Sequence, residues 1–335
     1  MDRMALTAAV EQALRAPSVH NTQPWRWRID DDRAELFADR DRQLVATDPD
    51  ARDLVLSCGA ALHHLVVALA AQGVDAQVDR LPDPDDVTHL STVTLRSGAG
   101  PAADATLAPQ IPLRRTDRRR MSHRPVPADL LHELAEHARG AGAVLVPTNR
   151  GDLRARLTAA LADAARQQQE APGYVTELTV WTHRYAGAHD GIAPGNLAAS
   201  SVGAPLDTPS PMRAFPQGRL AQPGPPLGHG LADDAAELVV VATPGDDVLD
   251  RLRAGEATSA VLLAATRAGL STTPLSQGME VDATREAIRF DILPMAETPQ
   301  LILRLGWPAT GAATLPTTPR RPLSAVLLPA MRRHA

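Results

Sequence analysis

Two apolar segments from distant parts of the chain align with each other without gaps, and this is the feature that most constrains the fold. Residues 59–74 read GAALHHLVVALAAQGV, and residues 255–270 read GEATSAVLLAATRAGL. Both glycines of each segment coincide, as does the Leu, Val and Ala face of a helix. A chance match between alanine-rich helices stays open. The other interpretation is a chain built from two related halves.

The hydrophobic periodicity around these segments predicts helices and strands in both parts of the chain. The first part should hold a helix up to Pro17, a β-hairpin over 25–38, a long helix over 51–72, and strands near 74–78 and 90–96. The second part should hold helices near 127–139, 151–169, 174–186 and 248–268, and strands near 143–147, 238–241 and 301–305. A stretch rich in Gly, Ala and Pro lies between them. We therefore place a first unit at 1–98, a linker at 99–112 and a second unit at 113–335.

Residues 187–232 interrupt the second unit with many glycines and prolines and little periodicity. Irregular segments of this length inside a compact protein are usually lids, binding segments or disordered stretches. We expect a lid here, and a linker of the same composition is the alternative.

Residues 16–25, APSVHNTQPW, place hydrogen-bonding side chains directly behind a helix-ending proline. Pro17 should end the preceding helix, because its ring disfavours helical geometry at the residue before it. Ser18, Asn21 and Gln23 are then available to hold the edge of a planar, heteroatom-rich ligand. A simple helix exit and turn is the alternative, since Ser and Asn are common capping residues.

The run RRTDRRR at 114–120 is a candidate phosphate site. Arginine pairs bidentately with phosphate oxygens, and the hydroxyl of Thr116 can donate a further hydrogen bond. A second basic pair, Arg320 and Arg321, could converge on the same anion. A solvated basic face is the alternative for the run.

Composition excludes several classes of protein. The formal net charge is -5, so no basic excess indicates binding to nucleic acid or to an anionic membrane. The 335 residues contain no lysine, which excludes a Schiff-base mechanism and a P-loop lysine. Cys58 is the single cysteine, which fits a reducing compartment. We also see no apolar run approaching the roughly 20 residues of a membrane span, and no signal peptide. The expected protein is cytoplasmic and its partner a small molecule.

Motif searches exclude other chemistries. The segment around His132 and His137 superficially matches the zinc motif HExxH, but these histidines are five residues apart instead of four and diverge around a helix. The motifs GxGxxG, GxSxG and GxxxxGK do not occur, which disfavours a Rossmann dehydrogenase, an α/β-hydrolase and a P-loop enzyme. We expect no metal site.

Four segments together resemble the nitroreductase family of FMN enzymes: APSVHNTQPW, RRTDRR, GLSTTPLSQG, and LILRLGWP followed by PRRP. The chain is most similar to the Acg branch of that family, in which one chain holds two nitroreductase-like halves. The resemblance implies an α+β fold of two fused halves, each an antiparallel sheet wrapped by helices. It also implies FMN as the cofactor.

The resemblance further implies roles for individual residues. Arg114, Thr116 and Arg118 would bind the FMN phosphate, with Arg320 or Arg321 assisting. Pro17, Ser18 and Asn21 would line the flavin ring, and Gln23 would add a contact. Ser276 and Gln277 replace the family's acidic residue and glycine beside the ring, so only their backbone is expected to take part. The resemblance assigns no catalytic side chain.

The halves are not equivalent, because each holds only one of the two motifs. The first has the ring-lining segment without a phosphate motif ahead of it, and the second has the phosphate motif but a helix exit reading Arg139-Gly140-Ala141-Gly142. We therefore expect one complete site per chain, so that a monomer suffices, with a dimer not excluded.

The resemblance leaves two main functions open. One is an oxidoreductase in which NAD(P)H reduces FMN and a nitroaromatic or quinone accepts two electrons. The other is a non-catalytic protein that stores or sequesters flavin beneath the lid at 187–232. A flavin-free stress or regulatory protein is a more remote third possibility.

Overall fold

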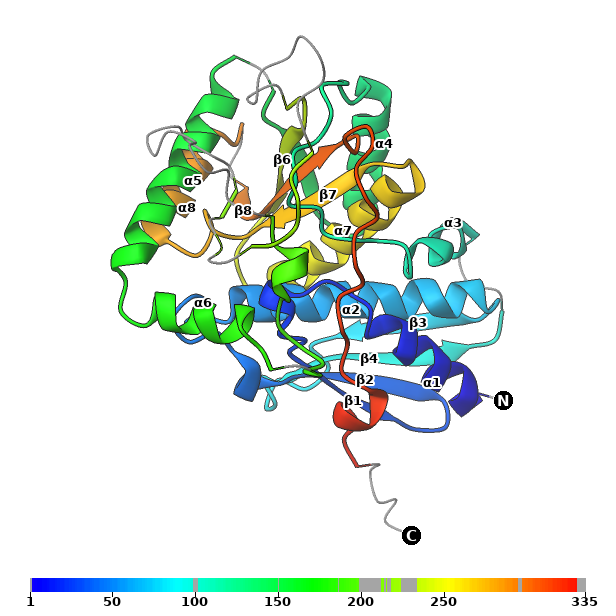
Figure 1. Ribbon diagram of the computed structural model, residues 1–335. Helices are drawn as coiled ribbons and strands as arrows, with labels where there is room; N and C mark the ends of the chain where they lie inside the picture. The colour runs from blue at the N-terminus through cyan, green and yellow to red at the C-terminus, as the bar shows by residue number, and fades with distance from the viewer. Residues whose placement is uncertain are drawn as a thin grey trace.

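Two antiparallel four-stranded sheets with helices form the protein, an α+β fold as expected (Figure 1). The computed structural model describes residues 2–98, 102–149, 151–185, 187–198, 212–213, 215, 218–223, 234–294 and 297–329. The first sheet has the strand order β1-β2-β4-β3, and the second has the order β5-β6-β8-β7. When the strands are numbered from one within each half, both sheets have the order 1-2-4-3. Both sheets also carry one register shift at the matching place, Leu36/Phe37 in β2 and Val241/Ala242 in β6.

The elements of the first half are α1 (Asp2–Ala13), β1 (Trp25–Ile29), β2 (Arg33–Ala38), α2 (Arg52–Ala71), β3 (Asp75–Arg80) and β4 (His89–Arg96). A short helix α3 (Ala102–Ala105) follows. Those of the second half are α4 (Ala128–Gly140), β5 (Val144–Pro147), α5 (Leu153–Glu170), α6 (Tyr174–Thr182), β6 (Glu237–Thr243), α7 (Val248–Arg267), β7 (Ser271–Leu275), α8 (Asp282–Asp291) and β8 (Thr298–Gly306).

These elements confirm the helices and strands predicted from periodicity, and they add three: α3 in the expected linker, β7 and α8. The strand β7 has the sequence STTPL, in which Pro274 and three hydroxyl or small side chains hide any alternation. The helix α8 is short and mostly polar. One expectation was wrong: α2 is long and apolar enough to cross a membrane by length and composition. However, 83% of its apolar window is buried inside the protein, so α2 is a core helix.

The two sheets are buried to different extents. In β1, buried Trp25, Trp27 and Ile29 alternate with partly exposed arginines, so the first sheet packs one face against helices. The run LVVVA in β6 is buried throughout. Val239 and Val241 pack in the hydrophobic cluster with residues of α4 and α7. Leu238, Val240 and Ala242 point to the other face and pack with residues of α5 and α8. The second sheet therefore has helices on both faces.

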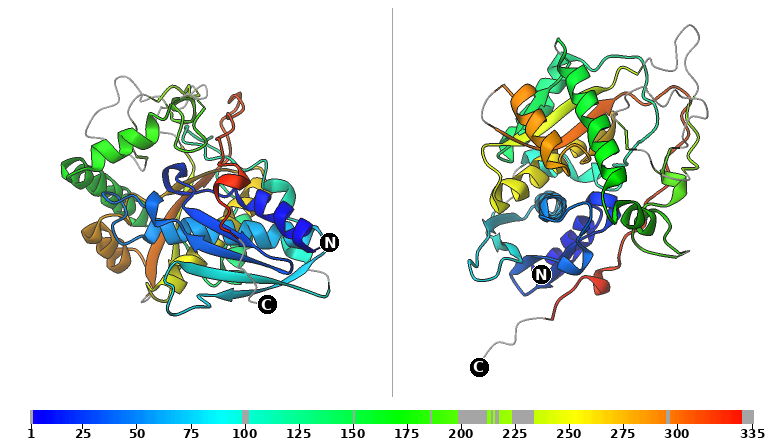
Figure 2. Two further views of the ribbon diagram at one scale, coloured as in Figure 1. Left: turned by 90° about the horizontal axis from the view of Figure 1, so that it is seen from below. Right: turned by 90° about the vertical axis from the view of Figure 1, so that its left-hand side faces the viewer.

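The long helices α2 and α7 lie between the two sheets and cross at a pair of glycines (Figures 1 and 2). A Cβ atom on Gly59 would clash with the carbonyl oxygen of Leu252 and lie 3.0 Å from the Cα of Gly255. A Cβ atom on Gly255 would clash in the same way with Leu56 and lie 2.9 Å from the Cα of Gly59. The contact is thus symmetric, and it joins the two glycines that open the aligned segments.

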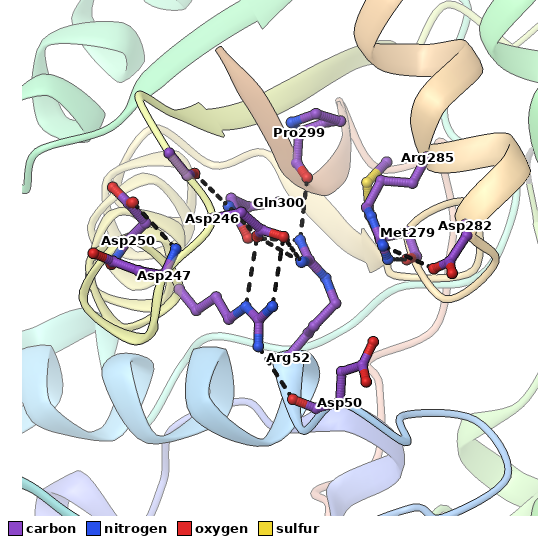
Figure 3. A network of polar contacts seen from close by, with 12 residues as sticks. Asp50, Arg52, Asp246, Asp247, Asp250, Met279, Asp282, Arg285, Pro299 and Gln300 are labelled. Carbon is purple, nitrogen blue, oxygen red and sulfur yellow. Dashed lines mark hydrogen bonds and ion pairs between the residues drawn. The ribbon is translucent and has the colours of Figure 1, made fainter. Parts of the chain in front are cut away.

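A polar network beside this crossing also joins the halves (Figure 3). Arg52 at the start of α2 forms an ion pair with Asp246 and donates to Oε1 of Gln300 at 3.0 Å. Arg251 of α7 contacts the same Asp246 and donates to the backbone oxygen of Asp50 at 3.1 Å. The carboxylate of Asp246 therefore holds one guanidinium from each half.

The C-terminal segment returns to the first sheet. Trp27 of β1 donates to the backbone oxygen of Val326 at 2.8 Å, and Leu328 donates back to Trp27 at 2.7 Å. Residues near 319–328, which follow the second sheet in the chain, thereby pack against the first half. The division of the chain into two units with a linker at 99–112 stays a prediction. Residues that follow this linker in the chain pack against the first unit.

Candidate functional site

A cavity lies where the exit of α1, the arginine run and the end of β7 meet. It encloses about 1430 Å³ of space free of protein atoms, including its open mouth. Nine of the eleven predicted site residues line it: Pro17, Ser18, Asn21, Arg114, Thr116, Arg118, Ser276, Gln277 and Arg320. Residues from the first half, the second half and the C-terminal segment thus share one space.

The segment after Pro17 has an unusual backbone. His20, Asn21 and Gln23 have φ of 44°, 57° and 52°, in the left-handed region that side-chain-bearing residues rarely adopt. Ser18 Oγ accepts from the backbone N–H of Gln23 at 3.0 Å, and Ser57 Oγ of α2 accepts from that of Val19 at 3.1 Å. These side chains hold the strained turn in place against α2.

Asn21 is a structural anchor as well as part of the cavity wall. Its Nδ2 donates to the backbone oxygens of Gly191 at 2.9 Å and Pro319 at 3.1 Å. Its Oδ1 accepts from Arg320 at 3.0 Å. The amide therefore ties the turn to two segments that lie far away in the sequence.

Gln23 and Arg321 are the two predicted residues outside the cavity lining. Gln23 is fully buried, where its Nε2 donates to the backbone oxygen of His189 at 2.8 Å and its Oε1 accepts from the N–H of Arg321 at 2.8 Å. Arg321 contacts the carboxylate of Asp39 at 3.4 Å. Both residues bind the turn on the side away from the cavity. A ligand in the cavity would therefore contact their neighbours and not these two side chains.

Arg114 is a buried cation without a counterion among the described residues. The residue is 5% exposed, and its Nε and Nη1 have no hydrogen-bond partner. Burial, followed by repulsion from Arg115 and Arg118, lowers the pKa of Arg114 to about 10. A buried guanidinium with free donors at the wall of a cavity indicates a site for an anion.

Arg320 and Arg118 add to this positive wall. Burial, followed by Arg114 and Arg115, lowers the pKa of Arg320 to about 9. Arg320 Nε is also buried without a partner. Arg118 has a pKa lowered to about 10, first by burial and then by Arg213. Its guanidinium lies 5.3 Å from the ring centre of Phe215 and donates to Asn196 O at 3.4 Å.

The arginine run is fixed to the edge of the second sheet. Thr116 forms a parallel β-bridge with Thr272 of β7. The hydroxyl of Thr273 donates a hydrogen bond to the backbone oxygen of Asp117 at 2.6 Å. The carboxylate of Asp117 pairs with Arg119 at 2.9 Å. Arg114 and Arg119 are both buried, so these two do not lie on a solvated basic face.

The side chains of the turn after β7 bind other parts of the protein. Ser276 Oγ donates to Glu280 at 2.6 Å, and Gln277 Nε2 donates to Gln168 at 2.8 Å. Both side chains are therefore committed to protein partners, which is consistent with a role carried by the main chain alone.

Part of the expected lid segment borders the cavity. Ile192, Asn196, Arg213 and Phe215 line it. The guanidinium of Arg213 pairs with Glu280, and it donates to the hydroxyl of Tyr174 at 2.9 Å. Residues 199–211, 214, 216–217 and 224–232 of the segment lie outside the described residues, so the lid stays a prediction.

Among the wall residues that sequence reasoning missed are His20 and Asp53. His20 is buried with its Nε2 unpartnered, and burial, followed by Arg213 and Arg118, holds its pKa well below its ordinary value. It was visible inside the motif APSVHNTQPW. Asp53 stands at the start of α2, where an acidic residue looks like an ordinary feature of a helix N-terminus.

Sequence comparison finds relatives that match this chain over nearly their whole length. A protein of Mycobacterium tuberculosis H37Rv, provisionally named NAD(P)H nitroreductase Rv3131, is 43% identical over 326 residues, 97% of this chain and 92% of that protein. A second protein of the same organism, provisionally named NAD(P)H nitroreductase acg, is 36% identical over 329 residues, 96% of this chain and 94% of that protein. No protein-family model matches the chain.

A solved structure shares the fold. It is described as a nitroreductase from Anabaena variabilis, and it matches 91% of this chain and 88% of its own with a TM-score of 0.50 and 12% identity. The likeness therefore covers both halves.

Proposed function

The chain belongs to the nitroreductase family, and on this premise we propose that it binds FMN and transfers two electrons from NAD(P)H to nitroaromatic or quinone acceptors. The observation that carries the proposal is one cavity that joins the buried, unpaired Arg114 to the turn at Ser18 and Asn21. FMN has an anionic tail and a planar, heteroatom-rich head, which match these two ends.

The residues present fit this cofactor. The unpartnered nitrogens of Arg114 and Arg320 would take phosphate oxygens, and Thr116 would add a hydroxyl donor. Leu56, Ile111 and Leu301 give the wall an apolar part that would exclude water from the ring. When bound, FMN accepts a hydride equivalent and passes two electrons on. The chain's own part is to bind, orient and shield.

Both motifs line one cavity of the same chain, so the proposal needs one chain for each FMN. This division of labour follows from the unlike halves: the second supplies the cations, the first supplies the turn, and the C-terminal segment supplies Arg320. We expect FMN to bind in a ratio of one per chain.

The test uses purified protein loaded with FMN under anaerobic conditions. NADPH or NADH should bleach the flavin absorbance, and a quinone or nitroaromatic compound should restore it. A flavin that binds but keeps its oxidised spectrum would overturn the reductase activity. A protein that takes up no FMN would overturn the cofactor as well.

A further inference from the structure

One face of α2 forms part of the cavity wall. Asp53, Leu56, Ser57 and Ala60 all line it, at the spacing that places residues on one side of a helix. Among the described residues of the lining, Asp53 alone carries a carboxyl group. The wall is otherwise rich in arginine, so a single acid there requires an explanation.

Asp53 is buried and unpaired. The residue is 4% exposed, and its Oδ2 has no hydrogen-bond partner. The two nearby guanidiniums have other partners. Arg52 donates through its Nη atoms to Asp246 and Gln300 (Figure 3), with its Nε left unpartnered, and Arg213 pairs with Glu280. An ionised carboxylate without a partner is costly in such a place, so the neutral acid is favoured.

A second acid, Asp48, also favours the neutral form of Asp53. Asp48 accepts the backbone N–H of Asp53 at 3.1 Å and that of Leu54 at 2.9 Å. Those bonds oppose the effect of burial, which raises the pKa of Asp48 to about 7. Burial, followed by repulsion from Asp48 and Glu280, raises the pKa of Asp53 well above its ordinary value, while Arg213 and Arg52 lower it. Burial and the neighbouring acids together favour the protonated form of Asp53.

The face of α2 that carries Asp53 also contacts the turn after Pro17. Ser57, one turn along α2 from Asp53, accepts from the backbone N–H of Val19 at 3.1 Å. Asp53 therefore lies on a wall that is fixed to the turn proposed above to line the flavin ring.

We propose that Asp53 is a binding and positioning residue that enters the cavity as a neutral carboxylic acid and donates a hydrogen bond to an acceptor atom of the flavin ring. The inference rests on the proposed function, because it takes FMN as the ligand. Oxygen and unprotonated nitrogen atoms at the ring edge can accept such a bond, and a carboxylate could only repel them.

The first experiment measures FMN affinity, by quenching of flavin fluorescence, from mildly acidic to alkaline solution. Wild-type affinity should fall as pH rises beyond the range in which Asp53 loses its proton. Asp53→Asn keeps a donor, so it should bind within about threefold of wild type at neutral pH and lose that dependence. Asp53→Leu should bind about tenfold more weakly, the value of one hydrogen bond. The FMN phosphate titrates equally in all variants, and Asp79→Asn on the exposed side of β3 is the matched control.

The second experiment needs no ligand. Wild-type protein without FMN should show the infrared carbonyl band of a protonated carboxyl that Asp53→Asn lacks. The stability of wild type should also fall more steeply than that of Asp53→Asn as pH rises, because the folded state holds a proton that the unfolded state has lost.

The outcomes separate the two proposals. Absence of FMN binding at any pH would overturn the proposed function. Binding with the same pH profile in wild type and Asp53→Asn, or equal affinity in Asp53→Leu, would overturn the role of Asp53 and leave the function standing.

Discussion

The two halves of the molecule agree at their shared contact and differ at the cavity. At the crossing of α2 and α7, Gly59 approaches Leu252 just as Gly255 approaches Leu56. Each half arranges its strands in the same order around its own helix. Close packing of two backbones tolerates only glycine, so both copies have the same residue there. The requirement is geometric, and it is the same from either side.

The exits of α1 and α4 show how the halves differ. In the second half, the chain leaves α4 through Gly142 with φ of 86°, a conformation that costs glycine little. In the first half, three side-chain-bearing residues adopt positive φ within four positions. Each such residue costs on the order of 1 kcal/mol. The first exit has kept side chains that bind neighbouring segments, at the expense of backbone strain. The halves therefore differ where a ligand is expected.

The symmetric crossing can be broken with one methyl group. Gly59→Ala should lower the free energy of unfolding by about 3 kcal/mol, because the new Cβ meets a backbone carbonyl that cannot move without separating the helices. Chemical denaturation monitored by circular dichroism measures the change. Gly255→Ala should have a similar effect, since its environment is the mirror of that of Gly59.

Gly140→Ala in α4 is the control for the crossing. A Cβ there meets nothing within 4 Å, so it should be neutral or stabilise by up to about 1 kcal/mol. A Gly59→Ala protein as stable as wild type would show that the helices do not depend on this contact.

The arginine run, present only in the second half, offers the next test. Arg114→Met should weaken FMN binding about a hundredfold, from the loss of charge-assisted hydrogen bonds worth about 3 kcal/mol. The same change should stabilise the protein without FMN by up to about 3 kcal/mol, since it removes a buried cation whose pKa is lowered to about 10.

Arg119→Met is the matched variant from the same run. Arg119 is paired with Asp117, so its removal leaves a buried carboxylate and should destabilise the protein by about 3 kcal/mol. Calorimetric titration and denaturation measure both quantities. Destabilisation of both variants to the same extent would argue against an anion site at Arg114.

A further difference between the halves lies one turn along the aligned helices. His63 of α2 aligns with Ser259 of α7, and the two are hydrogen-bonded at 2.8 Å. Burial, followed by His137, lowers the pKa of His63 to about 4. Between about 4 and the value near 6.5 of the unfolded chain, the unfolded state binds the extra proton, so stability is lost as pH falls.

His63→Asn should therefore reduce the loss of stability on acidification by about 1.4 kcal/mol per pH unit in this window. Asp48 and Asp53 act in the opposite direction, so the informative quantity is the difference between variant and wild type. His132→Asn on the exposed face of α4 is the control. Parallel pH profiles for His63→Asn and wild type would refute the assignment.

The sequence was sufficient for most of the elements and for part of the wall. Pro17, the arginine run and the aligned glycines are local signals, each with a direct backbone or charge consequence, and they led to nine residues that line one cavity. Gln23 looked the same as Asn21 in the motif, yet it faces away. Which side chains of a tight turn face a cavity depends on φ at each position, and positive φ at His20 and Asn21 is not encoded by residue type.

Asp53 illustrates the limit more sharply. Its spacing to Ser57 is visible in the sequence, but its lack of a partner is not. That depends on Arg52 reaching Asp246 and on Arg213 reaching Glu280, contacts between residues far apart in the chain. The return of the C-terminal segment to β1 is similarly a matter of tertiary packing.

Exchanging the residues of the two exits is the finest test of their difference. Asn21→Gly should relieve about 1 kcal/mol of strain but lose the bonds to Gly191, Pro319 and Arg320, for a net loss of about 1 kcal/mol. It should also weaken FMN binding, because Arg320 loses its support. Gly142→Asn should cost a similar amount, through backbone strain and a close contact with the side chain of Arg253, and leave FMN binding unchanged. Denaturation and fluorescence titration distinguish the two. A more stable Asn21→Gly protein that binds FMN as tightly as wild type would mean that the strained exit has no role in the site.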